Sequence, residues 1–350
     1  MKKLFPAFVF CAALPALAAG AAAETASSFD KSSGGSGQAA SSFDKNSGGS
    51  GQAYPAKSIR FIVPQAPGGT SDIVGRMVAL KLSEAVRQPV IVDNRNGASG
   101  TIGSAIAAKA PAGGYTLLLA YTVHTTAPAL YGRLPYDPVR SFTAITILAA
   151  APLVLVVPPK VPVTTLAEFI RFAKTGGRPL TFGSAANGSG GHLAGELFRI
   201  MSQAPVVHVP YRGTGPAMTE LIGGQIDFMF AAIIPVQPHV RSGRLRALAV
   251  SSLKRAISAP DVPTVAEAGL PGFEYVGWYG VLAPAGTPQT IVDRLHAEFV
   301  RIVRAPDMRE RLLADGAEAV GNTPAEFAVY LKAELERWTR IIKEAGTRID

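Results

Sequence analysis

Apolar and polar positions follow two different periods along this chain. From about residue 58 onward, short apolar runs rich in Val, Ile, Leu and Phe are separated by longer stretches whose apolar residues recur at helical spacing. Such alternation is typical of strand-helix-strand units that build a largely parallel sheet. The predicted strands are 58–63, 90–93, 116–120, 153–157, 180–183, 206–210, 228–230 and 247–251. The predicted helices are 71–85, 100–110, 165–174, 191–201, 216–222, 288–304 and 323–344.

The number of predicted strands bears on the domain organisation. So many strands over about 300 residues exceed what one ordinary domain core holds. We therefore expect an α/β protein with two lobes. The hydrophobic pattern alone does not locate the boundary between them.

The N-terminal segment has the pattern of an export signal. It combines a basic start, an apolar run over 4–19 and small residues before the end of the segment 1–23. The alternative, a membrane anchor, needs about 20 apolar residues, whereas this run is shorter and contains Pro6 and Pro15. We predict a periplasmic protein, secreted through this signal. The single cysteine, Cys11, leaves with the signal, so the mature chain has neither disulfides nor thiolate metal ligands.

A duplicated segment follows the signal. Residues 26–39 recur as 40–53, differing only where Ser32 is replaced by Asn46. Two copies are too few for a solenoid. The Gly, Ser and Gln content predicts a flexible tether over 24–53.

The chain carries an excess of positive charge. Its formal charge is +9, and removal of the two lysines in the signal leaves 9 − 2 = +7. The Lys and Arg residues are scattered rather than clustered with aromatic residues, which argues against a nucleic-acid partner. A diffuse positive field would instead attract small anions. Beyond the signal, no apolar stretch has membrane-spanning length, so we expect the mature chain not to span the membrane.

Two predicted strand-to-helix junctions contain glycines where free backbone amides and a helix dipole would form an anion site. They also lie at the carboxyl ends of predicted strands, where ligands of open parallel sheets collect. In the first junction the candidates are Gly68, Gly69, Thr70, Ser71 and Asp72. In the second they are Ser184, Asn187, Gly188, Ser189 and His192. The alternative for each is a tight turn without a ligand. A third glycine segment, 97–103, lacks dinucleotide-site spacing, and close helix-strand packing is the expected reason for its glycines.

Four further residues have both a functional and a structural interpretation. Thr122 and His124 follow a predicted strand and would line a pocket. Arg212 could pair with an anion or with a neighbouring Asp. Asp227 is either a ligand contact or, with more weight, a half-buried structural carboxylate. His192 likewise could donate to a carboxylate or serve as a structural hydrogen-bonding residue.

Local catalytic motifs are absent from the sequence. Neither Ser184 nor Ser189 stands in G-x-S-x-G, and there is no phosphate-binding loop of the G-x-x-x-x-G-K-[ST] type. The five histidines show no metal-ligand spacing. We therefore predict no enzyme. A secreted hydrolase whose Ser, His and Asp assemble only in space stays open as the alternative.

Eight ordered segments of the sequence resemble the extracytoplasmic receptors of tripartite tricarboxylate transporters, also called Bug receptors. They are the stretches 54–69 (in part), 92–103 (VDNRNGASGTIG), 109–118, 134–138 (LPYDP), 183–198, 209–213 (VPYRG), 262–273 and 278–288. The resemblance implies a two-lobed type II periplasmic-binding-protein fold with an interlobe cleft. It also implies lobe one over 54–152 plus 279–350 and lobe two over 153–278.

The resemblance further implies a function. Receptors of this kind hold a small carboxylate between the lobes and present it to a membrane permease, without metal or organic cofactor. The two glycine junctions coincide with the family's carboxylate-gripping loops. The sequence departs from the family at 140–144 (RSFTA), away from this grip. Ligand choice would lie with the expected loops 121–126 and 231–235.

Overall fold

The computed structural model describes residues 54–67 and 70–346, so the predicted signal, the predicted tether and the glycines at 68 and 69 lie outside the described residues. The strands are β1 (Ile59–Val63), β2 (Val90–Asn94), β3 (Thr116–Tyr121), β4 (Phe142–Val157), β5 (Leu180–Ser184), β6 (Val206–Pro210), β7 (Phe228–Ala232), β8 (Arg246–Val250), β9 (Val276–Pro284) and β10 (Glu318–Ala319). The helices are α1 (Thr70–Val86), α2 (Thr101–Ala108), α3 (Val123–Tyr131), α4 (Leu166–Thr175), α5 (Gly190–Ser202), α6 (Thr214–Ile222), α7 (Ile233–Arg241), α8 (Gln289–Arg304), α9 (Pro306–Ala314) and α10 (Pro324–Ala345).

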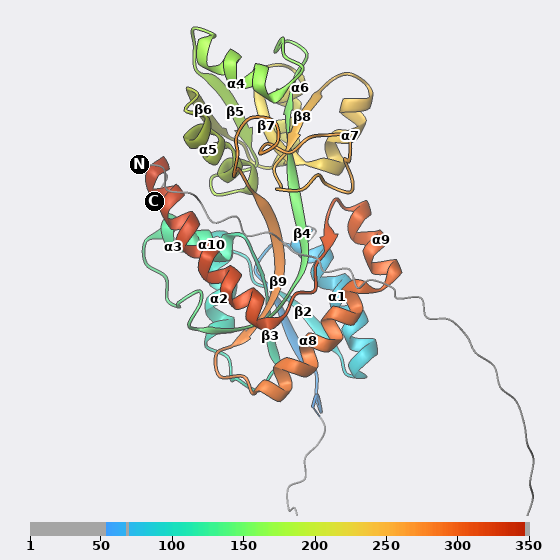
Figure 1. Ribbon diagram of the computed structural model, residues 1–350. Coiled ribbons are helices and arrows are strands. Elements are labelled where there is room, and N and C mark those ends of the chain that lie inside the picture. The colour runs from blue at the N-terminus through green and yellow to red at the C-terminus, as the bar shows by residue number, and fades with distance from the viewer. Residues whose placement is uncertain (1–53, 68–69, 347–350) are drawn as a thin grey trace, which may run out of the picture.

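The strands form two groups that share β4. In one lobe the order is β2-β1-β3-β9-β4, and in the other it is β4-β7-β5-β6, with β8 also paired to β4. The first half of β4 pairs with β9 as far as Pro152, and its second half, from Leu153, pairs with β7. Figure 1 shows β4 and β9 running from one lobe to the other. The predicted two-lobed α/β architecture is confirmed.

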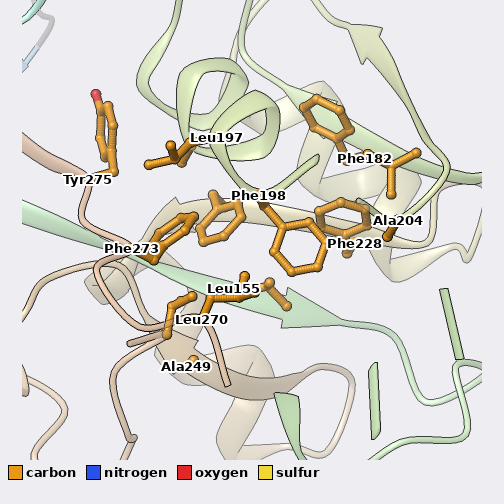
Figure 2. Packing of buried hydrophobic residues seen from close by; sticks show 14 of the residues in the cluster. Leu155, Phe182, Leu197, Phe198, Ala204, Phe228, Ala249, Leu270, Phe273 and Tyr275 are labelled. Atoms are coloured by element: carbon orange, nitrogen blue, oxygen red, sulfur yellow. The ribbon is translucent and has the colours of Figure 1, made fainter. Parts of the chain in front are cut away.

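Each lobe buries its sheet on both faces, as parallel βα units require. One face of the lobe-two sheet packs an aromatic cluster in which the rings of Phe182, Phe228 and Phe198 follow one another at centroid distances of 5.4 and 5.6 Å. Figure 2 shows these rings with Leu155 of β4 beside them. This cluster forms the floor beneath the junction between β5 and α5.

The last helix connects the two lobes. α10 begins with a capping box, in which Thr323 and Glu326 satisfy each other's backbone amides, and has Pro324 in its first turn. Its first half packs Phe327 and Leu331 into the lobe-one core. Its second half places Trp338 in the aromatic cluster of lobe two. α10 therefore braces the lobes against each other (Figure 1).

Several elements were not predicted. α3 and α7 contain prolines and β-branched residues, which disfavour helices in isolation. The expected loops at 121–126 and 231–235 are thus wrong: 123–126 and 233–235 belong to helices, Tyr121 and 231–232 end strands, and only Thr122 lies between elements. The strand predicted to begin at Leu153 in fact begins at Phe142. The prediction was wrong at this end because Pro152, after a run of alanines, has the pattern of a strand boundary.

Candidate functional site

The two glycine junctions occupy equivalent positions in the two lobes. Loop one, residues 64–72, joins β1 to α1, and loop two, residues 184–192, joins β5 to α5. Both strands are flanked by parallel neighbours, so both loops lie at a carboxyl edge of a parallel sheet.

Loop one is held in place by a charged network. The buried Asp72 carboxylate accepts hydrogen bonds from Asn94 Nδ2 at 2.9 Å and from Arg76 Nε at 3.0 Å. Asn94 Nδ2 also donates to the Gln65 carbonyl at 3.1 Å. Asp72 and Asn94 therefore tie the first turn of α1 to Gln65. Ser71 beside it is buried, Thr70 starts the helix, and Gly68 and Gly69 lie outside the described residues.

Loop two turns its carbonyls inward. The Ser184 carbonyl accepts from the Tyr211 amide at 2.9 Å, and the Ala185 carbonyl accepts from the Gly213 amide at 2.8 Å. The Ala186 carbonyl accepts from Ser184 Oγ at 2.9 Å and from the Ser189 amide at 3.2 Å. Because donors of the protein already occupy these carbonyls, loop two has few free lone pairs left to repel an incoming anion.

The start of α5 supplies donors. Ser189 is the N-cap residue, yet its side chain makes no capping bond, and within the described part of the chain its buried Oγ has no hydrogen-bond partner. The first amides of the helix lack intrahelical acceptors. A Cβ at Gly190 would lie 2.5 Å from Tyr275 Oη, and one at Gly191 would lie 2.7 Å from the Phe230 carbonyl oxygen. Only glycine lets the chain approach this closely, so the first turn of α5 packs directly against Tyr275 and the backbone of β7.

Two histidines lie under loop two. The buried His192 ring stacks on His208 of β6 with ring centroids 3.9 Å apart. His192 Nδ1 accepts from the Gly188 amide at 2.9 Å, and His208 Nε2 lies 2.7 Å from Ser184 Oγ. Burial lowers the pKa of His192 to about 4, and burial together with the neighbouring His192 lowers the pKa of His208 to about 3. Both rings are neutral at pH 7.

The Ser184–His208 contact has the spacing of a nucleophile and its base, so it bears on the hydrolase alternative. Ser184 is fully buried and donates its hydrogen to the Ala186 carbonyl. An imidazole with a pKa of about 3 is a weak general base at neutral pH. The contact therefore supports the loop rather than catalysis.

Tyr275 connects the neighbourhoods of the two loops. Its buried hydroxyl lies against Gly190 of α5 and hydrogen-bonds to the Thr122 side chain at the start of α3. The Tyr275 carbonyl accepts from Ser251 Oγ at 2.6 Å, which in turn accepts from the Leu153 amide at 2.8 Å. Tyr275 thus stands where the chain crosses between the lobes, in contact with residues of both.

His124 follows Thr122 in the chain and lies in the interior of lobe one. His124 is buried, its Nε2 lies 2.8 Å from the Pro138 carbonyl oxygen, and burial lowers its pKa to about 4. It borders a cavity of about 10 Å³ together with Tyr121, Tyr136 and residues of the third glycine segment. His124 is therefore a packed interior residue of lobe one.

The third glycine segment has the expected packing role and one unpredicted feature. A Cβ at Gly103 would lie 2.8 Å from both the Arg95 carbonyl oxygen and Pro64 Cβ, which confirms close packing. Ala98 and Ser99, however, have positive φ angles of 43° and 50° between two positive-φ glycines. Such strain in non-glycine residues is concentrated at functional sites. Tyr121 Oη donates to the Ser99 carbonyl at 3.3 Å, which places this strained turn beside the end of β3.

The remaining two candidates lie at opposite ends of the lobe-two sheet. The exposed Arg212 stands between the two residues whose amides hold loop two, and among the described residues no salt bridge engages it. Asp227 lies at the amino end of β5, where Arg178 donates to both its oxygens at 2.8 Å and the Thr181 amide donates at 2.8 Å. Burial alone would raise the pKa of Asp227, but these bonds lower it below its usual range. The structure favours the structural interpretation of Asp227.

The structure thus brings together Ser184, Asn187, Gly188, Ser189, His192 and Arg212, and links them through Tyr275 to Thr122. Sequence analysis missed the roles of His208 and Tyr275. Their contacts join segments distant in sequence, so no local spacing could reveal them. Among residues 54–67 and 70–346, no group of three His, Cys, Asp or Glu side chains is placed to hold a metal ion. No described helix is long and apolar enough to cross a membrane.

Comparisons with known proteins agree with this geometry. A family model described as "Tripartite tricarboxylate transporter family receptor" matches residues 74–347. The "UPF0065 protein in tcbD-tcbE intergenic region" of Pseudomonas sp. (strain P51) is 40% identical over 293 residues, covering 83% of this chain and 87% of that protein. The solved structure "R. palustris Rpa4515 with adipate" has 35% identity and a TM-score of 0.73, covering 85% of this chain and 100% of that one. "MatC (Rpa3494) from Rhodopseudomonas palustris with bound malate" has 32% identity and a TM-score of 0.69, covering 83% and 100%.

Proposed function

The chain belongs to the tripartite tricarboxylate transporter receptor family, and from that premise we propose that it is a periplasmic solute-binding receptor that captures a small organic acid and delivers it to a membrane permease. The predicted family resemblance and the type II periplasmic-binding-protein fold are confirmed by these relatives. Neither the family nor these neighbours points to catalysis.

The observation that carries the proposal is the polarity of loop two. Its carbonyls at 184–186 already accept hydrogen bonds from the protein, while Ser189 Oγ and the first amides of α5 remain as donors. Amides at a helix N-terminus and a hydroxyl with a free hydrogen suit one carboxylate group. The exposed Arg212 nearby adds a positive charge.

The expected ligand class is a small dicarboxylate. Adipate and malate, the acids in the two structural neighbours, each carry two carboxylates. In our proposal, loop two grips one carboxylate and loop one approaches it from the other lobe, while residues between them choose among acids. Ordered water would complete the contacts.

Lobe closure is the signal that the permease would read. We propose lobe one over 54–152 plus 279–350 and lobe two over 153–278. The change of β4 partners at Leu153 supports this division. Tyr275 touches both lobes close to Leu153, so its contacts would change as the lobes close. Because α10 packs on both lobes, it would limit how far they move relative to each other.

A thermal-shift panel tests the proposal. Mature protein, residues 24–350, is partially unfolded and dialysed to remove bound ligand, refolded, and heated with adipate, malate, citrate and the corresponding amides. A ligand at 100 times its Kd adds about 2.7 kcal/mol of stability, so one acid should raise Tm while its amide does not. If no acid raises Tm, or acid and amide act equally, the carboxylate receptor is rejected.

A substitution locates the grip. Ser189→Ala should weaken binding of the active acid about tenfold, because a hydrogen bond to a charged group contributes about 1.5–3 kcal/mol. It should leave unfolding nearly unchanged, since Ser189 Oγ has no partner among the described residues. Ser242→Ala, an exposed serine at the end of α7, is the matched control.

A further inference from the structure

The stacked histidines beneath loop two do more than fill space. His192 comes from α5 and His208 from β6, and Phe182 of β5 packs on both at centroid distances of 6.4 and 4.9 Å. His208 bonds to Ser184 at the start of loop two, and His192 bonds to Gly188 at its centre. The pair therefore holds the part of loop two that leads into the amides of α5.

Counting hydrogens assigns the tautomers of both rings. Ser184 has one hydroxyl hydrogen and gives it to the Ala186 carbonyl, so it must accept from His208, whose Nε2 carries the proton. The Gly188 amide can only donate, so His192 Nδ1 must be unprotonated. Two neutral rings, each with Nε2–H, satisfy every bond.

A single wrong proton would disturb the loop. With a proton on His192 Nδ1, two donors would face each other at 2.9 Å and the Gly188 amide would be expelled. Without the proton on His208 Nε2, Ser184 would turn its hydrogen toward the ring and leave the Ala186 carbonyl with the Ser189 amide as its one recorded donor. A carbonyl held by one donor and a turned amide would place more negative partial charge where the carboxylate is expected.

We propose that His192 and His208 act together as positioning residues, which lock loop two with its carbonyls inward and its donors outward and so set the affinity for the acid. This inference rests on the proposed carboxylate-binding function. The pair touches the loop and not the ligand, so its effect passes through Gly188, Ser184 and Ala186.

Two carboxylates of the surrounding elements are paired, whereas the exposed Arg212 has no salt bridge among the described residues. On α5, Glu196 pairs with Arg199 at 2.8 Å. At the far end of β5, Asp227 pairs with Arg178 at 2.8 Å. Glu220 of α6 acts on Tyr211, whose pKa is raised by burial first and then by that charge. β6 itself has no charged residue besides His208. A loss of affinity in acid can therefore be assigned to the pair by removing its members one at a time.

Four substitutions test the proposal by calorimetric titration with adipate and malate. His192→Asn places an amide oxygen near the Nδ1 position, and His208→Gln places an amide nitrogen near the Nε2 position. His192→Phe and His208→Phe keep an aromatic ring but remove the hydrogen bonds. We expect the Phe variants to lose at least tenfold in affinity and the Asn and Gln variants to stay within about threefold of the wild type.

Melting temperatures separate positioning from stability. If affinities simply follow Tm across the four variants, or if the Phe variants bind as the wild type does, the proposal is overturned. The ratio of wild-type to His192→Phe affinity, in which protonation of the acid itself cancels, should be constant from pH 8 to 5 and fall below.

A ligand-free measurement keeps the inference separate from the proposed function. ¹⁵N NMR of the histidine rings at pH 7 should show both as neutral Nε2–H tautomers, with a slowly exchanging Gly188 amide. An Nδ1–H tautomer at His192 would refute the positioning role whatever the protein binds. Correct tautomers in a protein that binds no acid would instead refute the proposed function and, with it, the effect of the pair on affinity.

Discussion

The two loops sit in equivalent places but are stabilised by different chemistry. Loop one is fixed by Asp72, whose carboxylate joins Arg76 and Asn94. Loop two contains no Asp, Glu, Lys or Arg and is fixed by neutral histidines, a serine and backbone bonds. The same strand-to-helix geometry is thus reached once with formal charge and once without.

This difference indicates a division of labour. A buried carboxylate in the first turn of α1 opposes an incoming anion, even when Arg76 offsets part of its charge. Loop two offers donors without any opposing charge, so it should supply most of the attraction. Loop one should then contribute shape and closure more than binding energy.

The largest expected effect comes from matched glycines beneath the loops. Gly75 and Gly195 are each the sixth residue of their helices. A Cβ at Gly195 would overlap the ring of Phe182, which supports both histidines, whereas a Cβ at Gly75 would meet only the ends of Val63 and Leu119, at 2.9 and 3.3 Å. Gly195→Ala should cost about 1–3 kcal/mol of unfolding free energy. Gly75→Ala should change it by less than about 1 kcal/mol, since helix propensity offsets the contact.

Urea denaturation of the two glycine variants measures this difference, and acid titration of the surviving folded protein follows. We expect Gly195→Ala also to weaken acid binding. Equal losses of stability in the two variants would contradict the structure, because they would mean that Gly75 and Gly195 are packed equally closely by their neighbours.

Substituting one hydrogen-bonded polar residue in each loop should change the affinity in different directions. Ser184→Ala removes the partner of His208 and one of the two donors to the Ala186 carbonyl, and affinity should fall tenfold or more. Asp72→Asn keeps an acceptor for Asn94 and removes a negative charge, so affinity should hold or improve by a few fold. A larger loss of affinity in Asp72→Asn than in Ser184→Ala would reverse the proposed division of labour.

The pH dependence of stability distinguishes the loops as well. A histidine whose pKa is near 6.5 when unfolded but about 4 in the folded state takes up its proton mainly on unfolding. Its stabilising effect is therefore complete above pH 6.5 and is lost as the pH falls toward 4, by up to about 1.4 kcal/mol per pH unit. His124 adds the same dependence, so the comparison must use variants.

Thermal unfolding between pH 7 and 4.5 gives the necessary slopes. His192→Phe should have a shallower slope than the wild type, while Arg241→Gln, at the exposed end of α7, should retain the wild-type slope. Parallel slopes for wild type and His192→Phe would show that His192 is not held neutral.

The smallest effect is expected at the exposed Arg212. Arg212→Gln should weaken acid binding only a few fold, more at low ionic strength, because an exposed charge is screened by salt. Arg241→Gln, an exposed arginine at the end of α7, is the control. An unchanged affinity at low salt would remove Arg212 from the site.

Much of the fold could be predicted because its parallel strands are short apolar runs followed by glycine-rich turns. β1, β5 and β6 begin and end within about one residue of their predicted bounds. The first half of β4 escaped prediction because alanines and Pro152 interrupt its pattern, and β9 escaped because Gly277 and Gly280 interrupt its own. Long-range pairing nevertheless holds both as strands. α3 and α7 escaped because tertiary packing overrides the propensities of their prolines.

The candidate site was predictable only in part. Glycine and serine at strand ends identified loop two, and Ser189 lies where an N-cap is expected. No sequence signal distinguished His208, which reaches Ser184 across 24 residues, from an ordinary strand histidine. Likewise, the positive φ angles at Ala98 and Ser99 are imposed by the surroundings.

The most direct test of the two-loop grip is hydrogen–deuterium exchange of peptides covering 64–72 and 184–192, with and without the acid that raises Tm most. The account predicts that the acid protects both loops together, with the larger protection in loop two, while peptides from α7 remain unchanged. Protection of one loop alone, or protection spread evenly over the whole chain, would contradict capture of one carboxylate ligand between the two lobes.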